Sequence, residues 1–133
     1  MQRRWTYYPA AVMFGFAVVF SAQAAEWVQV SKISDNIREV DKSSIHGAKP
    51  QLTFTSRHVI DDASELRVGH EAVKYLVMEQ RIDCGKRTTV MLSSEAQRAD
   101  MSRIDRQELV AENESPVLEG SVDEDVLKFV CAN

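Results

Sequence analysis

Apolar and polar residues alternate over short stretches after residue 24, which is the pattern of half-buried β-strands. Residues 27–31 and 37–40 are rich in strand formers, and residues 51–59 place Leu52 and Phe54 on one face. Turn-forming residues separate these stretches, at 34–36, 41–44 and 47–50. The pattern therefore predicts three short strands in this part of the chain.

The longest extended segment covers residues 72–84, and a return strand is predicted over residues 87–92. Gly85 and Lys86 between them suit a tight turn, because glycine tolerates positive φ. Alternation divides the side chains of the first strand between two faces, with Leu76, Met78, Ile82 and Cys84 on one and Tyr75, Val77, Glu79, Arg81 and Asp83 on the other. We expect the first face to cover the core and to bring Cys84 with it.

A helix is predicted near the C-terminus. Ser121 and Glu124 have the spacing of a capping box, and Glu124 and Lys128 follow at i, i+4 in the favourable order. Residues 60–69 are predicted to form a surface loop or a short helix, whereas residues 103–111 suit either a strand or a helix. Together these elements predict the α+β class, as a small antiparallel β-sheet with a C-terminal helix packed on it.

The first 24 residues have the composition of a secretory signal peptide. Arg3 and Arg4 give a positive start, residues 10–20 are almost wholly apolar, and Ala22 and Ala24 mark a small-residue cleavage site. The apolar run is about half of the roughly 20 residues that a membrane-spanning helix needs, which disfavours an uncleaved anchor. We expect residues 1–24 to be removed and residues 25–133 to form a single domain.

The net charge of the domain bears on whether it binds nucleic acid. The chain has 16 Lys and Arg against 20 Asp and Glu, and removal of Arg3 and Arg4 leaves a formal charge of −6. Binding to nucleic acid depends on clustered Lys and Arg that neutralise phosphates. The acidic domain therefore argues against a nucleic-acid partner.

The two cysteines, Cys84 and Cys131, raise the question of covalent chemistry. A cysteine nucleophile needs a reduced thiol beside a histidine base. A metal site needs more Cys or His at ligand spacing, whereas His46, His58 and His70 are twelve residues apart. Because thiols oxidise outside the cytoplasm, we predict a Cys84–Cys131 disulfide.

No known catalytic or phosphate-binding motif occurs in the sequence. Asp61 and Asp62, with His58 and Glu65, offer ligands for a cation, but their spacing matches no calcium loop, and a solvated loop is the favoured alternative. We therefore predict a protein that is not an enzyme and that carries no cofactor and no metal.

The second face of the 72–84 strand offers a candidate binding patch of Tyr75, Val77 and Arg81. Apolar and cationic side chains combine in this way at protein interfaces. The alternative is that a second layer covers this face, either the 60–69 segment or a second copy of the chain. An exposed sheet edge can also pair two chains, so a homodimer is a further expectation.

A series of short motifs resembles the surface-adhesin protein E family of Gram-negative bacteria. A Trp opens the domain, an Asp-x-x-Ser-Ile segment follows, and a strand ends in Asp-Cys with an Arg soon after; a Pro and a Ser then precede a helix that contains Cys. The residues that carry the resemblance are Trp27, Asp41, Ser44, Ile45, Asp83, Cys84, Arg87, Pro116, Ser121, Leu127 and Cys131. The chain departs from the pattern in two places, since it lacks a lipid-anchoring Cys after the leader and an aromatic residue before Pro116.

The resemblance implies a small antiparallel sheet with a packed helix, in an exported and non-catalytic domain. It also implies protein ligands, such as the matrix and serum proteins vitronectin and laminin, and hence a surface adhesin that recognises host or matrix proteins. Two alternatives stay open: a periplasmic accessory or structural protein of the cell envelope, and a small hydrolase with an unrecognised site. The expected location is the periplasm or the cell surface and outer membrane, with no transmembrane span after signal cleavage.

Overall fold

The computed structural model describes residues 24–61, 66–109 and 113–133. The predicted leader, residues 1–24, lies outside the described residues except for its last position. No helix in the described ranges has the length and apolar character needed to span a membrane.

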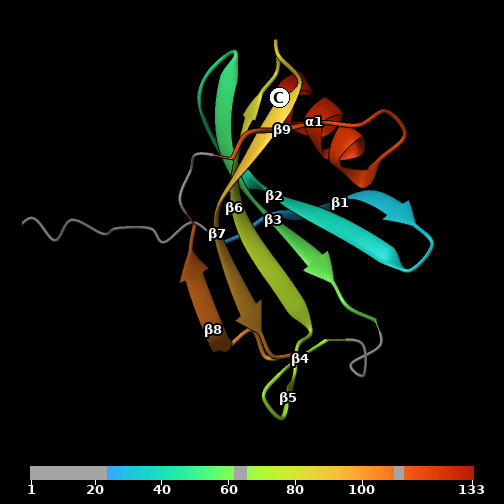
Figure 1. The fold of residues 1–133 in the computed structure, drawn as a ribbon, viewed down its shortest axis with the longest axis vertical. Coiled ribbons are helices and arrows are strands. Elements are labelled where there is room, and N and C mark those ends of the chain that lie inside the picture. Colours follow the sequence, from blue (N-terminus) through green and yellow to red (C-terminus); the bar gives the residue numbers. More distant parts are fainter. Residues whose placement is uncertain (1–23, 62–65, 110–112) are drawn as a thin grey trace, which may run out of the picture.

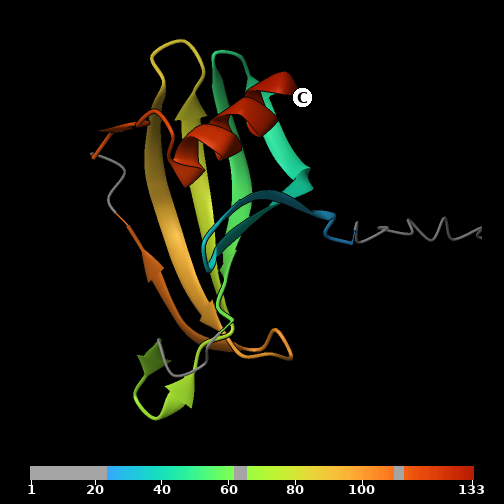
Figure 2. The same cartoon turned by 90° about the vertical axis from the view of Figure 1, so that its right-hand side faces the viewer.

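One antiparallel sheet forms most of the molecule (Figure 1). Its strands lie in the order β1-β2-β3-β6-β7-β8, and the short β9 pairs with β7. The bounds are β1 Trp27–Ile33, β2 Asn36–Ala48, β3 Gln51–Val59, β6 Tyr75–Asp83, β7 Thr88–Gln97, β8 Arg103–Glu108 and β9 Ser115–Pro116. Neighbouring strands of the main path follow one another along the chain, so the sheet is a meander that curves into a half-barrel (Figure 2).

A small hairpin interrupts the meander between β3 and β6. Its strands are β4 (Arg67–Val68) and β5 (Glu71–Ala72), and it lies at the end of the sheet remote from the helix (Figures 1 and 2). The hairpin occupies part of the 60–69 segment that was expected to be a loop or short helix; residues 62–65 of that segment lie outside the described residues.

The helix α1 (Val122–Ala132) packs on the concave side of the half-barrel (Figure 2). Val126, Leu127 and Val130 are its buried residues. They form the main core with side chains of one sheet face, namely Val40, Leu52, Phe54 and Ile82, and with Val117. The predicted helix and its Ser121 N-cap are confirmed, and Leu52 and Phe54, which were predicted to share one strand face, both lie in the core.

The structure corrects the expected balance of secondary structure, because the molecule is mainly β. The predicted turn at 41–44 is wrong: β2 continues through it, with an irregularity in its pairing to β3 between Asp41 and His46. β7 continues to Gln97 instead of ending near residue 92. The ambiguous 103–111 segment contains β8, which ends at Glu108. These segments are polar because one face of an antiparallel sheet meets water, which weakens their strand signal.

Candidate functional site

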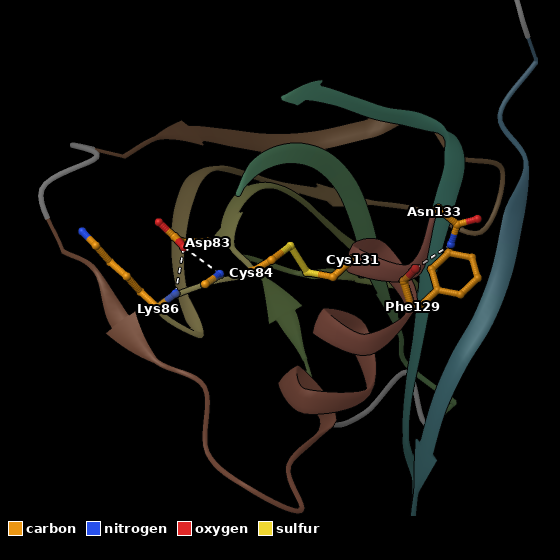
Figure 3. The surroundings of a disulfide bond; sticks show 7 residues. Asp83, Cys84, Lys86, Phe129, Cys131 and Asn133 are labelled. Atoms are coloured by element: carbon orange, nitrogen blue, oxygen red, sulfur yellow. Dashed lines mark hydrogen bonds between the residues drawn. A yellow bond between two sulfur atoms is a disulfide. The ribbon is translucent and has the colours of Figure 1, made fainter. Parts of the chain in front are cut away.

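A disulfide joins the end of α1 to the β6–β7 hairpin (Figure 3). Cys84 follows β6, Cys131 lies in the last turn of α1, and their Cα atoms are 6.0 Å apart. Both side chains pack against the main core. The bond consumes both thiols of the chain, so neither cysteine is available as a nucleophile or a metal ligand.

Asp83 shapes the turn beside this disulfide (Figure 3). Its Oδ1 accepts hydrogen bonds from the backbone N–H of Lys86, at 2.8 Å, and of Gly85, at 2.9 Å. The Lys86 N–H is the main cause that holds the pKa of Asp83 below its ordinary value, while burial acts in the opposite direction. Asp83 is therefore a buried structural acceptor, although strand alternation places it on the second face of β6.

Glu124 ties the first turn of α1 to the same hairpin. Its carboxylate lies 2.7 Å from a guanidinium nitrogen of Arg87 and 3.1 Å from Lys128 Nζ. Ser121 Oγ accepts from the Glu124 N–H at 3.2 Å, as the capping box predicts, but the Glu124 carboxylate reaches the N–H of Gly120 instead of that of Ser121. Hydrogen bonds from Lys128 and Gly120 lower the pKa of Glu124.

The Asp-x-x-Ser-Ile segment stabilises the irregularity in β2. Asp41 Oδ1 accepts from the backbone N–H of Glu26 and of Ser43, at 2.9 and 3.0 Å. Ser44 Oγ accepts from the Thr55 N–H at 2.8 Å, and thus replaces a missing ladder bond between β2 and β3. Like the hairpin motifs, this segment has a structural role, so a binding site is to be sought elsewhere.

The sheet face remote from α1, called the outer face below, carries Tyr75 and Val77. Cross-strand pairing sets Val77 between Arg57 of β3 and Glu95 of β7. The Arg57 guanidinium stacks between two aromatic rings, with its Cζ 4.1 Å from the Trp27 ring centroid and 4.4 Å from that of Tyr75. We call Trp27, Arg57 and Tyr75 the aromatic–arginine cluster.

Arg57 is held on its remaining side by an ion pair. Its Nε donates to Glu39 Oε2 at 2.5 Å, and 12% of its side chain is exposed. The guanidinium plane is therefore fixed between the rings by both stacking and a charge-assisted hydrogen bond. The cluster presents two half-buried aromatic side chains in a rigid arrangement.

Charges of both signs border the cluster on β7 and β8. Glu95 accepts hydrogen bonds from Gln97 and Arg103 and lies 3.9 Å from a nitrogen of Arg106. Burial alone would raise the pKa of Glu95, but these donors outweigh it and the pKa lies below its ordinary value. The border is thus a network of paired charges, not a field of one sign.

Arg81 lies on the same face as Tyr75 and Val77 but not beside them. Six residues along a strand correspond to about 20 Å, so Arg81 and Tyr75 are at opposite ends of β6. Arg81 lines a cavity of about 140 Å³ together with Gln51, Asp83, Lys86, Thr88, Val90 and Glu114. The cation next to Tyr75 is Arg57 instead.

The described part of the 60–69 segment does not form a layer over the outer face. Leu66 packs with Ile60, Val73 and Ala96 in a second, smaller core. Val68 lines a hollow with Leu76, which alternation places on the face opposite to Tyr75. The described residues of this segment, 60, 61 and 66–69, therefore do not support the alternative that it covers the candidate patch of Tyr75, Val77 and Arg81.

Sequence reasoning missed Trp27 and Arg57 as members of the site. Their strand positions were predicted, and alternation places Arg57 opposite Leu52 and Phe54. The contacts of Arg57 with Trp27 and Tyr75 depend on the registers of β1, β2, β3 and β6 against one another, which a single sequence does not reveal. Within the described ranges, no group of three or more His, Cys, Asp or Glu side chains is arranged to hold a metal ion.

Comparison with known proteins identifies the family. The model of the Surface-adhesin protein E family matches residues 27–132. The chain belongs to the surface-adhesin protein E family. Its membership agrees with the resemblance carried by the Asp83–Cys84 and Cys131 motifs.

Solved structures of protein E from Haemophilus influenzae have the same fold as this adhesin E-family chain. One matches with a TM-score of 0.60 at 9% identity and covers 80% of this chain and 84% of the other. A second, from a non-typeable strain, has a TM-score of 0.57 at 9% identity, with coverages of 85% and 80%. A third, in crystal form II, has a TM-score of 0.54 at 9% identity, with coverages of 84% and 98%. No curated protein sequence matches the chain.

Membership of this family suggests a surface adhesin that acts by binding. The disulfide is the bond expected of an exported protein. At 9% identity the structural likeness concerns the fold alone, so the ligand has to be argued from this chain's own surface.

Proposed function

We propose that this chain is an exported adhesin of the bacterial surface that binds a host or matrix protein through its outer face. The aromatic–arginine cluster and Val77 form the centre of the proposed contact, and Arg81 extends it toward the β6–β7 turn. The leader pattern of residues 1–24, the disulfide and the family support export.

The stacking of Arg57 between Trp27 and Tyr75 is the observation that carries this proposal. Aromatic and arginine side chains dominate the centres of protein interfaces, where a few of them account for most of the affinity. Here the three side chains are already ordered against one another and against Glu39. A partner that contacts them would therefore lose little side-chain entropy on binding.

The mixed charges around Glu95 favour a protein partner over a polyanion. Arg103 and Arg106 each pair with Glu95, so their charges are largely neutralised within the chain. A partner surface of complementary shape with an apolar centre and a polar rim would fit such a face. The expected homodimer stays a separate prediction, because it depends on a sheet edge and not on this face.

The test is a binding measurement with immobilised vitronectin and laminin as probes. The wild-type protein, recovered with its disulfide formed, is compared with Tyr75→Ala and with the matched control Leu118→Ala. Leu118 is 67% exposed and lies in the loop before α1, so the control also removes a large exposed apolar side chain. Circular dichroism spectra check that both variants fold.

We expect wild type and the control to bind at least one probe with equal affinity, and Tyr75→Ala to bind about tenfold or more weakly, as hot-spot truncations do. Equal binding of all three proteins would show that Tyr75 and the surrounding outer face are not the binding site. Failure of the wild-type protein to bind either probe at micromolar concentration would count against the adhesin function and turn the search to envelope partners.

A further inference from the structure

The concave side of the half-barrel contains a cavity that is separate from the proposed binding surface on the outer face. It has a volume of about 480 Å³ and lies between β2, β6, β7 and the first turn of α1. Its lining residues are Arg38, Met78, Gln80, Thr89, Met91, Leu109, Asn113, Ser115 and Asp123. Pockets for small molecules have this size and this mixture of apolar walls and a few polar groups.

Arg38 is the charged residue that gives the cavity its chemistry. Only 13% of its side chain is exposed, and its Nε is buried without a hydrogen-bond partner among the described residues. Its ion-pair partner is Asp123 of α1, at 3.9 Å, which is longer than a hydrogen bond. Burial lowers the pKa of Arg38 and Asp123 offsets this only in part, yet a guanidinium stays protonated at neutral pH.

Two further polar groups line the same cavity. Thr89 Oγ1 is buried and has no hydrogen-bond partner in the part of the chain that the structure describes. Gln80 is buried, and its Oε1 accepts from Ser56 Oγ at 2.6 Å, which leaves the amide NH₂ as the donor end of the side chain. Arg38 Nε and Thr89 Oγ1 are thus two buried polar atoms without partners in the described ranges, which costs stability and suits this cavity to a ligand with hydrogen-bond acceptors.

Apolar side chains complete the lining beside these polar groups. They are Met78, Met91 and Leu109, of which Met91 and Leu109 are 37% and 39% exposed. Met78 precedes Gln80 by two positions on β6, and Met91 is the cross-strand partner of Gln80. Methionine side chains are flexible and adapt to ligands of different shape, so they would contact the carbon skeleton of a bound molecule while the neighbouring polar groups contact its head group.

We propose that this cavity binds a singly charged organic carboxylate that carries an apolar group. The carboxylate pairs with the Arg38 guanidinium, the Thr89 side chain and the Gln80 amide complete its polar surroundings, and the apolar group lies against Met78, Met91 and Leu109. Arginine presents its N–H groups in a planar fork that matches a carboxylate. Asp123 beside Arg38 makes a dianion such as phosphate a poorer fit, because one negative charge already lies there.

Two sources share this chemistry: a free aliphatic acid, and the C-terminal carboxylate of a peptide that ends in an apolar residue. The test uses sodium octanoate, the uncharged octanamide, and the dipeptide acetyl-glycyl-leucine with a free carboxylate. Each is titrated into the ¹⁵N-labelled exported protein, recovered in its disulfide-bonded form. The readout is the Arg38 Nε–H resonance together with the backbone amides of β6 and β7.

We expect octanoate or the dipeptide to shift the Arg38 Nε–H signal saturably, and octanamide to bind at least tenfold more weakly. The tighter of the two acids identifies the source. Arg38→Gln should abolish the response, whereas Arg67→Gln, in the exposed β4–β5 hairpin, should leave it unchanged. Thr89→Val, which keeps the shape of the side chain, should weaken binding several-fold and serves as a second test if Arg38→Gln does not fold.

Three results would overturn the proposal: no saturable shift with either acid at millimolar concentration, equal binding of octanamide and octanoate, or unchanged octanoate binding in both Arg38→Gln and Thr89→Val. None of them bears on Tyr75 or on matrix proteins, so the cavity and the proposed adhesin function fail or hold separately.

Discussion

Arg57 and Arg38 are both largely buried arginines of the main sheet, yet their surroundings differ. Arg57 has an ion pair at 2.5 Å and a ring on either side, so its charge and its planar faces are both satisfied. Arg38 has one carboxylate at 3.9 Å and a buried Nε without a partner in the described ranges. The contacts of Arg57 therefore stabilise the outer face. Arg38, in contrast, keeps a hydrogen-bond donor for a ligand inside the half-barrel.

Replacement of Arg57 by Met tests the stabilising role of the cluster. Loss of the stacking and of the Glu39 ion pair should lower the free energy of unfolding by about 1–2 kcal/mol. Urea denaturation measures this change, with Arg103→Met as the matched control. Arg103 is 59% exposed, so its replacement should change stability by no more than about 0.5 kcal/mol. Equal effects of the two substitutions would contradict the structural role given to the cluster.

Asp83 provides a pH-dependent test at the same scale. Its folded-state pKa lies below the ordinary value of about 3.9, chiefly because of the Lys86 N–H. A depressed carboxyl pKa contributes stability that is fully present above the unfolded-state pKa and is lost as the pH falls through the folded-state pKa. Asp83→Asn should therefore lower the melting temperature at pH 7, and the gap between variant and wild type should shrink below about pH 4. A gap of constant size from pH 7 to pH 3 would show that the charge of Asp83 does not contribute.

Among the elements, the best predicted are those whose signals are local. The β6–β7 hairpin follows from alternation and from Gly85, and α1 follows from the Ser121 cap and its apolar face; both are present. The ends of β2 and β7 were mispredicted because side-chain hydrogen bonds and bulges let a strand continue where the sequence suggests a turn. The aromatic–arginine cluster and the Arg38 cavity depend on cross-strand register and sheet curvature, which no local pattern encodes.

The N-cap of α1 can be tested by Ser121→Ala. The substitution removes the acceptor for the Glu124 N–H and should cost about 1 kcal/mol of unfolding free energy. Glu119→Ala, in the exposed turn just before the cap, is the control and should stay within about 0.5 kcal/mol of wild type. A neutral Ser121→Ala would mean that the disulfide and core packing alone define where the helix begins.

At the scale of the whole molecule, several residues that carry the family resemblance hold the helix on the sheet. Asp83, Cys84 and Arg87 fix the hairpin turn and its links to α1, and Cys131 completes the disulfide. One residue that carries the resemblance, Trp27, belongs to the aromatic–arginine cluster, whereas Arg57 and Tyr75 do not carry it. Family membership alone therefore does not identify the ligand.

Removal of the disulfide tests the largest single contribution to this architecture. The bond closes a loop with a sequence separation of 47, so Cys84→Ser with Cys131→Ser should lower the free energy of unfolding by about 4 kcal/mol. Reduction of the wild-type protein should lower its stability to a similar degree and leave the double variant unchanged. A double variant as stable as the oxidised wild type would show that core packing alone holds α1 in place.

The proposed function requires that the protein faces the outside of the cell and binds there. This location is tested by protease treatment of intact cells, followed by immunoblotting for this protein and for a periplasmic control. We expect this protein to be digested while the control survives. Protection of both until the outer membrane is opened would contradict this expectation, and would place the outer face and the Arg38 cavity among periplasmic partners.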